Sequence, residues 1–396
     1  MATVTLTAGL AGCAAEPDPG TVTVLNSATD TTEHEANQDF FDRCAEPLGL
    51  RVEQISVPAD QVATKALRMA SSDSLPDILE LDGSELPQFA ETDGLRPIAD
   101  TGVETDQLSD SSVSLGSFDG VQYGVARSVN SLALIYNTEL LAEAGLEPPT
   151  TWDELRTAAA ALTGGDTYGM AFSASPNADG VYQFLPFFWS AGGDETALAE
   201  GTGGAAALQL WKDLVDEGSA SRSVVNWNQQ DVNDQFLAGR AAMMINGPWQ
   251  VPALDGQDAV DWAVASIPVP EAGQDPVPPI GGTVMTVPKN DDQERERNAG
   301  RVLTCLNSEE NQLAWGERVN NVPTDAGAAA TYREQNPRLA PFADLVLTAR
   351  SRTEQVGTGW PVVGDALAGA FQSVLTGRAS PEEALRTAQQ QAGDAR

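Results

Sequence analysis

Among the residue types that can carry catalysis or bind metals, histidine and cysteine are scarce in this chain and carboxylates are abundant. The chain has one histidine, His34, and three cysteines, but 57 aspartates and glutamates. A Ser-His-Asp triad or a multi-histidine metal site would depend on that single imidazole. We therefore expect no catalytic residue of that kind, no metal and no cofactor. The acidic residues could include the carboxylate pair of a glycoside hydrolase, although no motif singles out a pair.

Charge and length set further limits. Twenty-two lysines and arginines against 57 acidic residues give a formal net charge of −35. Such a surface repels nucleic-acid phosphates and anionic lipid headgroups, so we expect neither nucleic-acid binding nor adsorption to a membrane through a basic patch. The 396 residues are 41% hydrophobic. They suit two compact lobes better than one ordinary core.

The first 20 residues are typical of an export and anchoring segment. Small and apolar residues lead to Leu10-Ala-Gly-Cys13, and a polar stretch with two prolines follows. This tetrad resembles the bacterial lipoprotein processing site, where the cysteine is acylated. The run is too short to span a bilayer. We expect a protein that is exported and held on the outer face of the cell membrane by Cys13. The alternative is a chance cysteine, since no basic residue precedes Arg43.

Two cysteines remain, Cys44 and Cys305. Export makes a disulfide permissible, and two cysteines allow one pairing. Two buried free thiols are the alternative.

Strands and helices alternate along the chain. This alternation predicts βαβ units and a parallel sheet, and so an α/β protein. In the first part we expect strands at 21–25, 51–57 and 76–81, and helices at 37–48, 61–71 and 86–91. Further on we expect strands at 132–136, 241–245, 264–268 and 283–287, and helices at 208–217 and 294–306.

Capping residues mark several helix ends. Thr138 is expected to cap one helix that Gly145 stops. Thr151, with Glu154 three residues later, predicts a capping box. Ser380 before Pro381 predicts the start of the last helix.

Several longer stretches are similar to one family when they are taken in order. They are 75–82, 123–141 with 148–155, 187–194, 236–249, 280–283 and 375–385. This ordered set resembles the extracellular sugar-binding proteins of ABC importers, the maltose-binding-protein class, over roughly residues 20 to 390. The Cys44 and Cys305 pair also looks like that of an actinobacterial trehalose-binding relative.

The resemblance implies a periplasmic-binding-protein fold, with two α/β lobes joined by crossing hinge strands around a central ligand cleft. After the segment 1–20, the first lobe would comprise 21–131 plus 282–327, and the second 132–281 plus 328–396. A monomer would capture a mono- or oligosaccharide in the cleft and deliver it to the transmembrane subunits of an ABC permease. The bottom-up expectations of length and alternation agree with this architecture.

Aromatic rings are the first class of candidate contacts, because a sugar presents C–H groups on its faces. Trp249 follows Asn-Gly-Pro at a strand end and matches a stacking position of the family. Trp227 and Trp360 lie in polar or glycine-rich loops. Trp189 lies in a very apolar helix, where packing is an equal alternative. Trp152 opens a helix and is assigned a structural role, and Trp211, Trp262 and Trp315 are assigned to the core.

Polar groups would bind the hydroxyl edge of the sugar. Asp82 ends the third strand, at the sheet edge where α/β proteins bind ligands, although a helix cap also explains it. Asn130 matches a contact position of the family. Arg352 could give paired donors to neighbouring hydroxyls, or be a surface charge. The remaining candidates are Asp30, Glu35, Glu85, Gly282 and Thr283, and a hinge turn would equally explain Gly282.

Three functions stay open at this point. The leading hypothesis is a sugar receptor. The second is a receptor for an amino acid, a peptide or a polyamine, and the third is an exported glycoside hydrolase. The eight tryptophans favour sugar.

Overall fold

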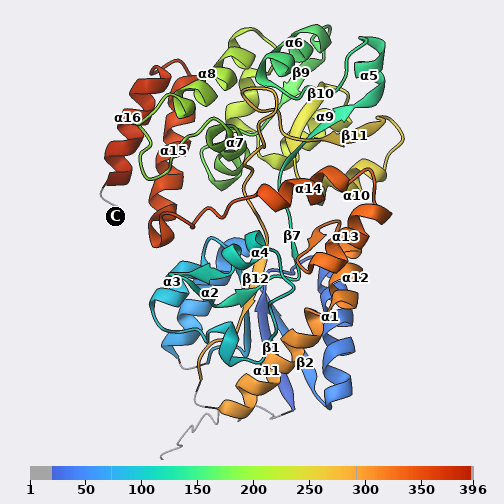
Figure 1. The fold of residues 1–396 in the computed structure, drawn as a ribbon, viewed down its shortest axis with the longest axis vertical. Helices are drawn as coiled ribbons and strands as arrows, with labels where there is room; N and C mark the ends of the chain where they lie inside the picture. The colour runs from blue at the N-terminus through green and yellow to red at the C-terminus, as the bar shows by residue number, and fades with distance from the viewer. Residues whose placement is uncertain (1–19, 73, 291, 394–396) are drawn as a thin grey trace, which may run out of the picture.

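The computed structural model of the protein describes residues 20–393 except 73 and 291. The expected lipidation site Cys13 lies outside the described residues. The chain forms two lobes, one below the other in Figure 1, and each lobe contains its own sheet.

The lower lobe is built on a five-stranded mixed sheet. Its strand order is β2 (Arg51–Ser56), β1 (Thr21–Asn26), β3 (Ile78–Asp82), β12 (Thr283–Thr286) and β6 (Gly124–Val125). The first three strands are parallel, as expected, but β12 runs antiparallel to both of its neighbours. The predicted parallel pairing is therefore confirmed for β1, β2 and β3, and β12 makes the sheet a mixed one. The chain returns to this sheet directly from the upper lobe, without the crossover helix that a parallel strand would need.

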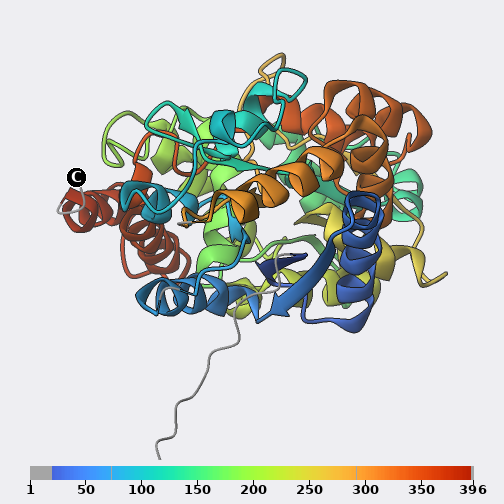
Figure 2. The same cartoon turned by 90° about the horizontal axis from the view of Figure 1, so that it is seen from below.

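Helices cover both faces of this sheet (Figures 1 and 2). Alternate strand residues point to opposite faces. Val24 and Ile78 pack in one cluster with residues of α1 (Thr31–Ala45) and α11 (Gln293–Leu306), and Leu25 and Leu79 pack with residues of α2 (Ala59–Ser71) and α3 (Leu86–Glu91).

Two features fix helix α1. Asp30 accepts hydrogen bonds from the amides of Thr32 and Glu33, so the helix begins six residues before the expected start at 37. A disulfide between Cys44 and Cys305 then joins α1 to α11. The alternative of two free thiols is excluded in this structure.

The upper lobe contains a four-stranded sheet of order β11 (Trp262–Ala265), β8 (Ala133–Asn137), β10 (Ala241–Asn246) and β9 (Tyr168–Ala171). Strand β8 is antiparallel to both neighbours, and β10 is parallel to β9. Every residue of β10 is buried. The helices of this lobe are α5 (Thr138–Glu143), α6 (Trp152–Leu162), α7 (Ala178–Ser190), α8 (Gly203–Asp216), α9 (Gln229–Leu237), α10 (Val251–Asp255), α15 (Trp360–Leu375) and α16 (Pro381–Ala392).

An aromatic core holds α7, α8 and α15 together. The Trp211 ring lies between those of Phe172, Phe184, Phe187 and Phe371, with centroid distances of 4.3 to 6.0 Å. Trp211 and the other two tryptophans assigned to the core, Trp262 and Trp315, are all buried, as expected.

Smaller elements lie near the junction of the lobes or at their edges. They are α4 (Asp110–Leu115), α12 (Glu309–Val319), α13 (Ala326–Gln335), α14 (Ala340–Thr348), the short strands β4 (Ser117–Phe118), β5 (Val121–Gln122), β7 (Ser128–Val129) and β13 (Val322–Pro323), and the 3-10 turns η1 (Glu46–Leu48), η2 (Ile98–Asp100), η3 (Arg222–Asn226), η4 (Pro248–Gln250) and η5 (Gly357–Gly359).

The segments that cross between the lobes are tied to one another by backbone hydrogen bonds. Asn130 and Gly281 exchange two, of 2.9 and 2.8 Å. Ile280 donates to the Arg350 carbonyl, and Arg350 donates to the Pro278 carbonyl, each over 2.9 Å. Strands β7 and β13 pair beside them. Three chain segments that are distant in sequence thus meet at the junction.

The predicted caps are largely confirmed. Thr151 with Glu154 and Ser380 with Glu383 each form a capping box, and Pro381 opens the last helix. Thr138 is not the cap of α5, because the Asn137 side chain accepts from the Leu140 amide and Thr138 is already helical. The side-chain oxygen of Asn137, one residue before Thr138, is the group that accepts from the free N–H of Leu140.

Candidate functional site

An ion pair connects the two lobes at the carboxyl end of β3. The Arg352 Nη2 atom lies 2.7 Å from Asp82 Oδ1, although the two residues are 270 positions apart in the sequence. Arg352 comes from the segment between α14 and α15, and its side chain is only 10% exposed, whereas that of Asp82 is 43% exposed. Asp82 also accepts hydrogen bonds from the amide and the hydroxyl of Ser84. Asp82 therefore fixes its own turn and pairs with Arg352, whereas the N-cap position of α3 belongs to Glu85, so the helix-cap interpretation is wrong and a ligand contact by Asp82 stays a prediction.

Tyr182 of α7 links this ion pair to other candidates. Its ring lies 5.2 Å from the Arg352 guanidinium carbon, and its centroid is 6.4 Å from that of Trp249. Its hydroxyl lies 3.3 Å from both Asn130 Oδ1 and the Pro279 carbonyl oxygen, and can donate to either. Burial raises the pKa of Tyr182 far above its usual value, so the hydroxyl stays a donor. We call Asp82, Arg352, Tyr182, Asn130 and Trp249 the junction cluster.

Trp249 presents a half-buried indole at the end of β10. Its ring folds over Gly247, where an added Cβ would come within 2.0 Å of it. The flanking segment is held to the start of α9, because Asn246 and Gln250 both donate to the Gln229 carbonyl. The fold thus holds the indole in one place while leaving part of its surface free, which is what stacking on a ligand requires.

Glycines allow the crossing strand to pass close to this cluster. A Cβ at Gly281 would lie 2.3 Å from the Tyr182 hydroxyl and 2.4 Å from Asn130 Oδ1. Gly282 has φ +138°, a conformation that other residues rarely adopt, and its carbonyl accepts from the Gly83 amide. Thr283 follows as the exposed first residue of β12, opposite Asp82. These contacts give Gly282 the hinge-turn role, and they place both residues beside the cluster.

Two candidate tryptophans are buried away from it. Trp189 is 4% exposed, donates its indole N–H to Glu195 over 2.9 Å and stacks under Arg350 at 4.5 Å. Trp360 is 7% exposed and forms the first residue of α15. Both placements favour packing over ligand contact.

Three further candidates, Trp227, Asp30 and Glu35, also lie outside the cluster. Trp227 is half-buried after η3, and its carbonyl accepts from the Ser173 hydroxyl over 2.7 Å. Asp30 caps α1, which accounts for its position without a ligand. Glu35 is exposed on the same helix.

Sequence reasoning missed Tyr182. It lies in the same apolar helix as Trp189, where core packing is the ordinary explanation of an aromatic residue. Its one distinguishing signal is a hydroxyl, since a buried phenol needs a hydrogen-bond partner.

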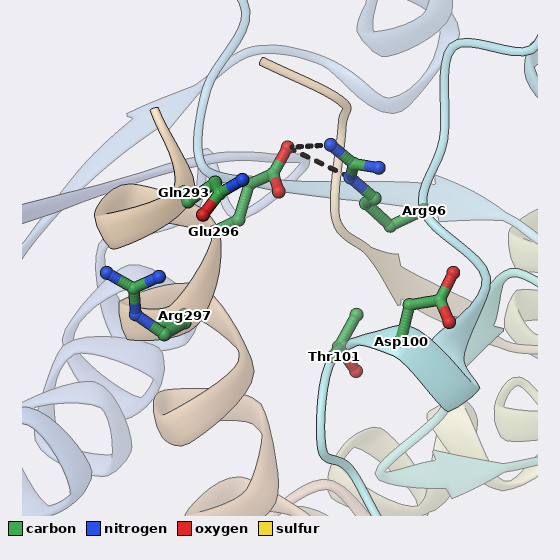
Figure 3. Close-up of a pocket in the computed structure, with 6 residues that line it drawn as sticks. All are labelled: Arg96, Asp100, Thr101, Gln293, Glu296 and Arg297. Carbon is green, nitrogen blue, oxygen red and sulfur yellow. Dashed lines mark hydrogen bonds and ion pairs between the residues drawn. The ribbon is translucent and has the colours of Figure 1, made fainter. Parts of the chain in front are cut away.

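Two cavities lie in the lower lobe. One, of about 180 Å³, is bordered by Asn130, Gly282 and Thr283 and so adjoins the junction cluster. The other, of about 280 Å³, lies between the 96–101 segment and the start of α11 (Figure 3). There Arg96 and Glu296 form an ion pair of 2.9 Å. The second cavity borders the start of α11, which follows β12, and is therefore away from the strand end that carries Asp82.

Two features are absent from the part of the chain that the structure describes. In it, no three His, Cys, Asp or Glu residues are grouped so that they could hold a metal ion. No helix within it has both the length and the apolar character that a membrane crossing needs.

Glu85 gives the site a pH-dependent feature. Burial and the charge of Asp82 raise the pKa of Glu85 from 4.5 to about 7, and Arg352 only partly opposes this. Since the folded-state pKa is the higher one, the folded protein keeps a proton that the unfolded chain releases between about 4.5 and about 7. Stability attributable to Glu85 is therefore lost as pH rises through that interval.

Glu85→Gln should remove this loss. We expect its free energy of unfolding, relative to wild type, to increase as pH rises from about 4.5 to about 7 and then to level off, because the variant has no buried charge to form. Urea unfolding at a series of pH values measures it. Glu91→Gln, which removes an exposed carboxylate from the same helix, is the control. A difference that does not change with pH would contradict the raised pKa.

Comparison with known proteins shows which family has this architecture. Residues 40–340 match the family model of the bacterial extracellular solute-binding proteins. A cyclic alpha-maltosyl-1,6-maltose binding protein from Arthrobacter globiformis has a similar structure, with a TM-score of 0.83, 27% identity, and coverage of 96% of this chain and 99% of that one. UgpB of Mycobacterium tuberculosis, solved with glycerophosphocholine, has a TM-score of 0.81 at 20% identity, over 96% of this chain and 98% of that one.

A curated relative is the galactooligosaccharide-binding protein of Bacillus subtilis, 25% identical over 329 residues, which are 78% of this chain and 74% of that protein. The likeness to UgpB shows the fold alone. The family match covers most of the chain, and the two lobes with their tied crossing segments are the architecture of such receptors. The chain belongs to the bacterial extracellular solute-binding protein family.

Proposed function

We propose that this protein is the extracytoplasmic receptor of an ABC importer and that its solute is a neutral mono- or oligosaccharide. The observation that carries the proposal is the junction cluster. It links a carboxylate, a guanidinium, an amide and a phenol, and the phenol lies beside a half-buried indole. Such polar groups suit the hydroxyl edge of a sugar, and the indole suits its C–H face. The Arthrobacter and Bacillus proteins, by their names, bind saccharides.

The mechanism follows from the crossing segments. Binding energy from contacts on both lobes shifts an equilibrium between open and closed forms, and the closed form is presented to the permease. A sugar hydroxyl near Asp82 and Arg352 would insert into their ion pair or bridge it. The two lobes would then be connected through the ligand and no longer by the direct contact between these side chains. The protein acts by binding, without catalysis.

We also propose how the chain divides between the lobes. The first lobe takes 21–131 plus a second segment from 282, and the second lobe takes 132–281 plus the C-terminal segment. Helix α13 (Ala326–Gln335) spans the expected boundary at 327 and packs against α12 of the lower lobe. We therefore place that boundary after Gln335.

A ligand panel tests the function. Thermal shift and intrinsic tryptophan fluorescence should respond to at least one of maltose, maltotetraose, trehalose, galactooligosaccharides and glucose, because ligand contact changes the surroundings of Trp249 and stabilises the folded state. Amino acids, polyamines and glycerophosphocholine form the second arm, and aryl glycosides, scored for release of the aryl alcohol, form the third. A response confined to the second arm, or turnover in the third, would reject the sugar-receptor proposal.

Trp249→Ala should weaken binding of the responding sugar by about tenfold or more, because its stacking surface is lost. Trp152→Ala is the matched control. Trp152 is also half-buried in the upper lobe, but it packs on Phe187 and donates to the Pro268 carbonyl over 3.1 Å. The Trp152→Ala variant should have a lower free energy of unfolding and an unchanged affinity for the sugar. Calorimetric titration measures both, and equal affinities for wild type and Trp249→Ala would remove Trp249 from the site.

We propose that the protein is exported and anchored by an acyl chain on Cys13, on the strength of the Leu-Ala-Gly-Cys tetrad. With a basic n-region supplied upstream in a bacterial host, the mature protein should begin at an acylated Cys13 and sediment with membranes. Cys13→Ser should remain unprocessed or be released. Mass spectrometry of the N-terminal peptide decides the point, and an unmodified Cys13 in the mature wild-type protein would refute the anchor.

A further inference from the structure

Arg352 of the junction cluster lies on a segment with little regular structure. Between the end of α14 and the turn η5, the chain follows turns and one isolated bridge, which pairs Arg350 with Pro279. A long side chain on such a segment keeps a single position only when neighbouring contacts lock it. The contacts of Arg350, two positions before Arg352, therefore bear on where the Arg352 guanidinium lies.

The Arg350 side chain is held by two residues at and just beyond the end of α7. Its Nη2 atom pairs with Oε1 of Glu195, and its guanidinium carbon lies 4.5 Å from the ring centroid of Trp189. The Trp189 indole N–H donates to the other carboxylate oxygen, Oε2, of Glu195 over 2.9 Å. The Glu195 side chain is 0% exposed, so its charge depends on these partners inside the protein. We call Glu195, Trp189 and Arg350 the anchor triad.

The backbone of Arg350 is fixed as well. Its amide donates to the Pro278 carbonyl and its carbonyl accepts from the Ile280 amide, each over 2.9 Å. The backbone is thus tied to the crossing strand, while the side chain is tied to the end of α7. Position 350 is held from two sides before the chain reaches Arg352.

Helix α7 presents a second aromatic ring to the same segment. Tyr182 and Trp189 are seven residues apart on α7, and that spacing places them on one face of the helix. The Arg350 guanidinium lies over Trp189, and the Arg352 guanidinium lies over Tyr182 with 5.2 Å between its carbon and the ring centroid. One face of α7 therefore carries both guanidinium groups. A shift of Arg350 along that face would move Arg352 with it, since one residue separates them.

We propose that the anchor triad positions Arg352, because it holds the segment in the place from which the guanidinium reaches Asp82. Glu195, Trp189 and Arg350 are then positioning residues, which act on the site through Arg352 and without contact to a solute. The effect on sugar affinity rests on the proposed receptor function, whereas the position of Arg352 does not depend on it. The inference also gives Trp189 a part in the site from outside the junction cluster.

Glu85 reports the position of Arg352 without any ligand. The charge of Arg352 lowers the pKa of Glu85, which burial and Asp82 together raise to about 7. Glu195→Gln keeps the shape of the side chain but removes the charge that holds Arg350. The Arg352 guanidinium should then move away, and the pKa of Glu85 should rise further, by at least about 0.5. Arg352→Gln, which removes the guanidinium altogether, should give the largest rise.

Urea unfolding of the full chain measures this pKa. The free energy of unfolding is compared with and without Glu85→Gln at a series of pH values, in wild type, in Glu195→Gln and in Arg352→Gln. In each background the difference levels off above the folded-state pKa of Glu85. The levelling should therefore occur at higher pH in Glu195→Gln than in wild type. A role of Glu195 in stability alone would lower all the free energies and leave this pH unchanged.

Sugar affinity is the second readout. The probe is the tightest-binding sugar among maltose, maltotetraose, trehalose, galactooligosaccharides and glucose, titrated by calorimetry. Glu195→Gln should lower its affinity at least about threefold, and should cause little further loss in a chain that already carries Arg352→Gln, because no guanidinium is then left to position.

Trp189→Phe is the second variant, and it carries the test if Glu195→Gln does not fold. It keeps a ring beneath Arg350 but removes the N–H group that Glu195 accepts. The pKa of Glu85 should rise in this variant too, by less than in Arg352→Gln.

Asp77→Asn is the matched control. Asp77 is a buried carboxylate that pairs with Arg295 over 2.7 Å, and neither residue is among the charges that act on Glu85. The variant should have a lower melting temperature, because a buried charge loses its partner, while the pKa of Glu85 stays within about 0.2 of its wild-type value.

The outcomes separate this inference from the function beneath it. If Arg352→Gln raises the pKa of Glu85 and Glu195→Gln does not, the positioning role is overturned and the receptor function stands. No rise in Arg352→Gln also overturns it, because the guanidinium is then not held beside Asp82. An affinity loss from Glu195→Gln that is equal with and without Arg352 does the same. A wild-type protein that binds no sugar of the panel rejects the receptor proposal, and the pKa comparison then decides the positioning role by itself.

Discussion

The backbone pairing of Asn130 with Gly281 is the constraint on which the rest of the structure depends. The two sheets meet there, and the pairing leaves no room for a side chain at position 281. The same contact places the Asn130 amide against Tyr182. A joint made of crossing strands resists sliding of one lobe along the other. The geometry of the site is therefore set at the hinge.

Arginine has an unusual place in this strongly acidic protein. Arg127 and Arg352 are both buried beside the lobe junction, and each lies near carboxylates and an aromatic ring. A planar guanidinium can stack and donate in several directions, whereas a lysine would present a single hydrated charge. The net charge of −35 describes the outer surface. Near the lobe junction, Arg127 lies close to Glu80 and Glu33, and Arg352 lies close to Asp82 and Glu85.

The sequence predicted the positions of helices and strands better than it predicted which elements and side chains contact one another. Strand β1, helix α3 and the capping box at Thr151 were predictable, because each depends on residues within a few positions of one another. The direction of β12 was not, since it depends on the route of the chain through the other lobe. The candidate site residues show the same difference between what could be predicted and what could not. Asp82 and Trp249 follow strands that sequence reveals, and both lie in the junction cluster, whereas Trp189 and Trp360 are buried elsewhere.

By itself, the sequence determined the α/β class, the division into two lobes and the family, since local periodicity and ordered motifs carry that information, whereas the pairing of Cys44 with Cys305 was decided by the structure. Only the tertiary structure decided which side chains meet. Arg352 pairs with Asp82 across 270 residues, Tyr182 links the members of the junction cluster, and Arg127 and Glu80 line the same cavity. The physical reason is that these contacts form between lobes and across a sheet, where separation along the chain says nothing about separation in space.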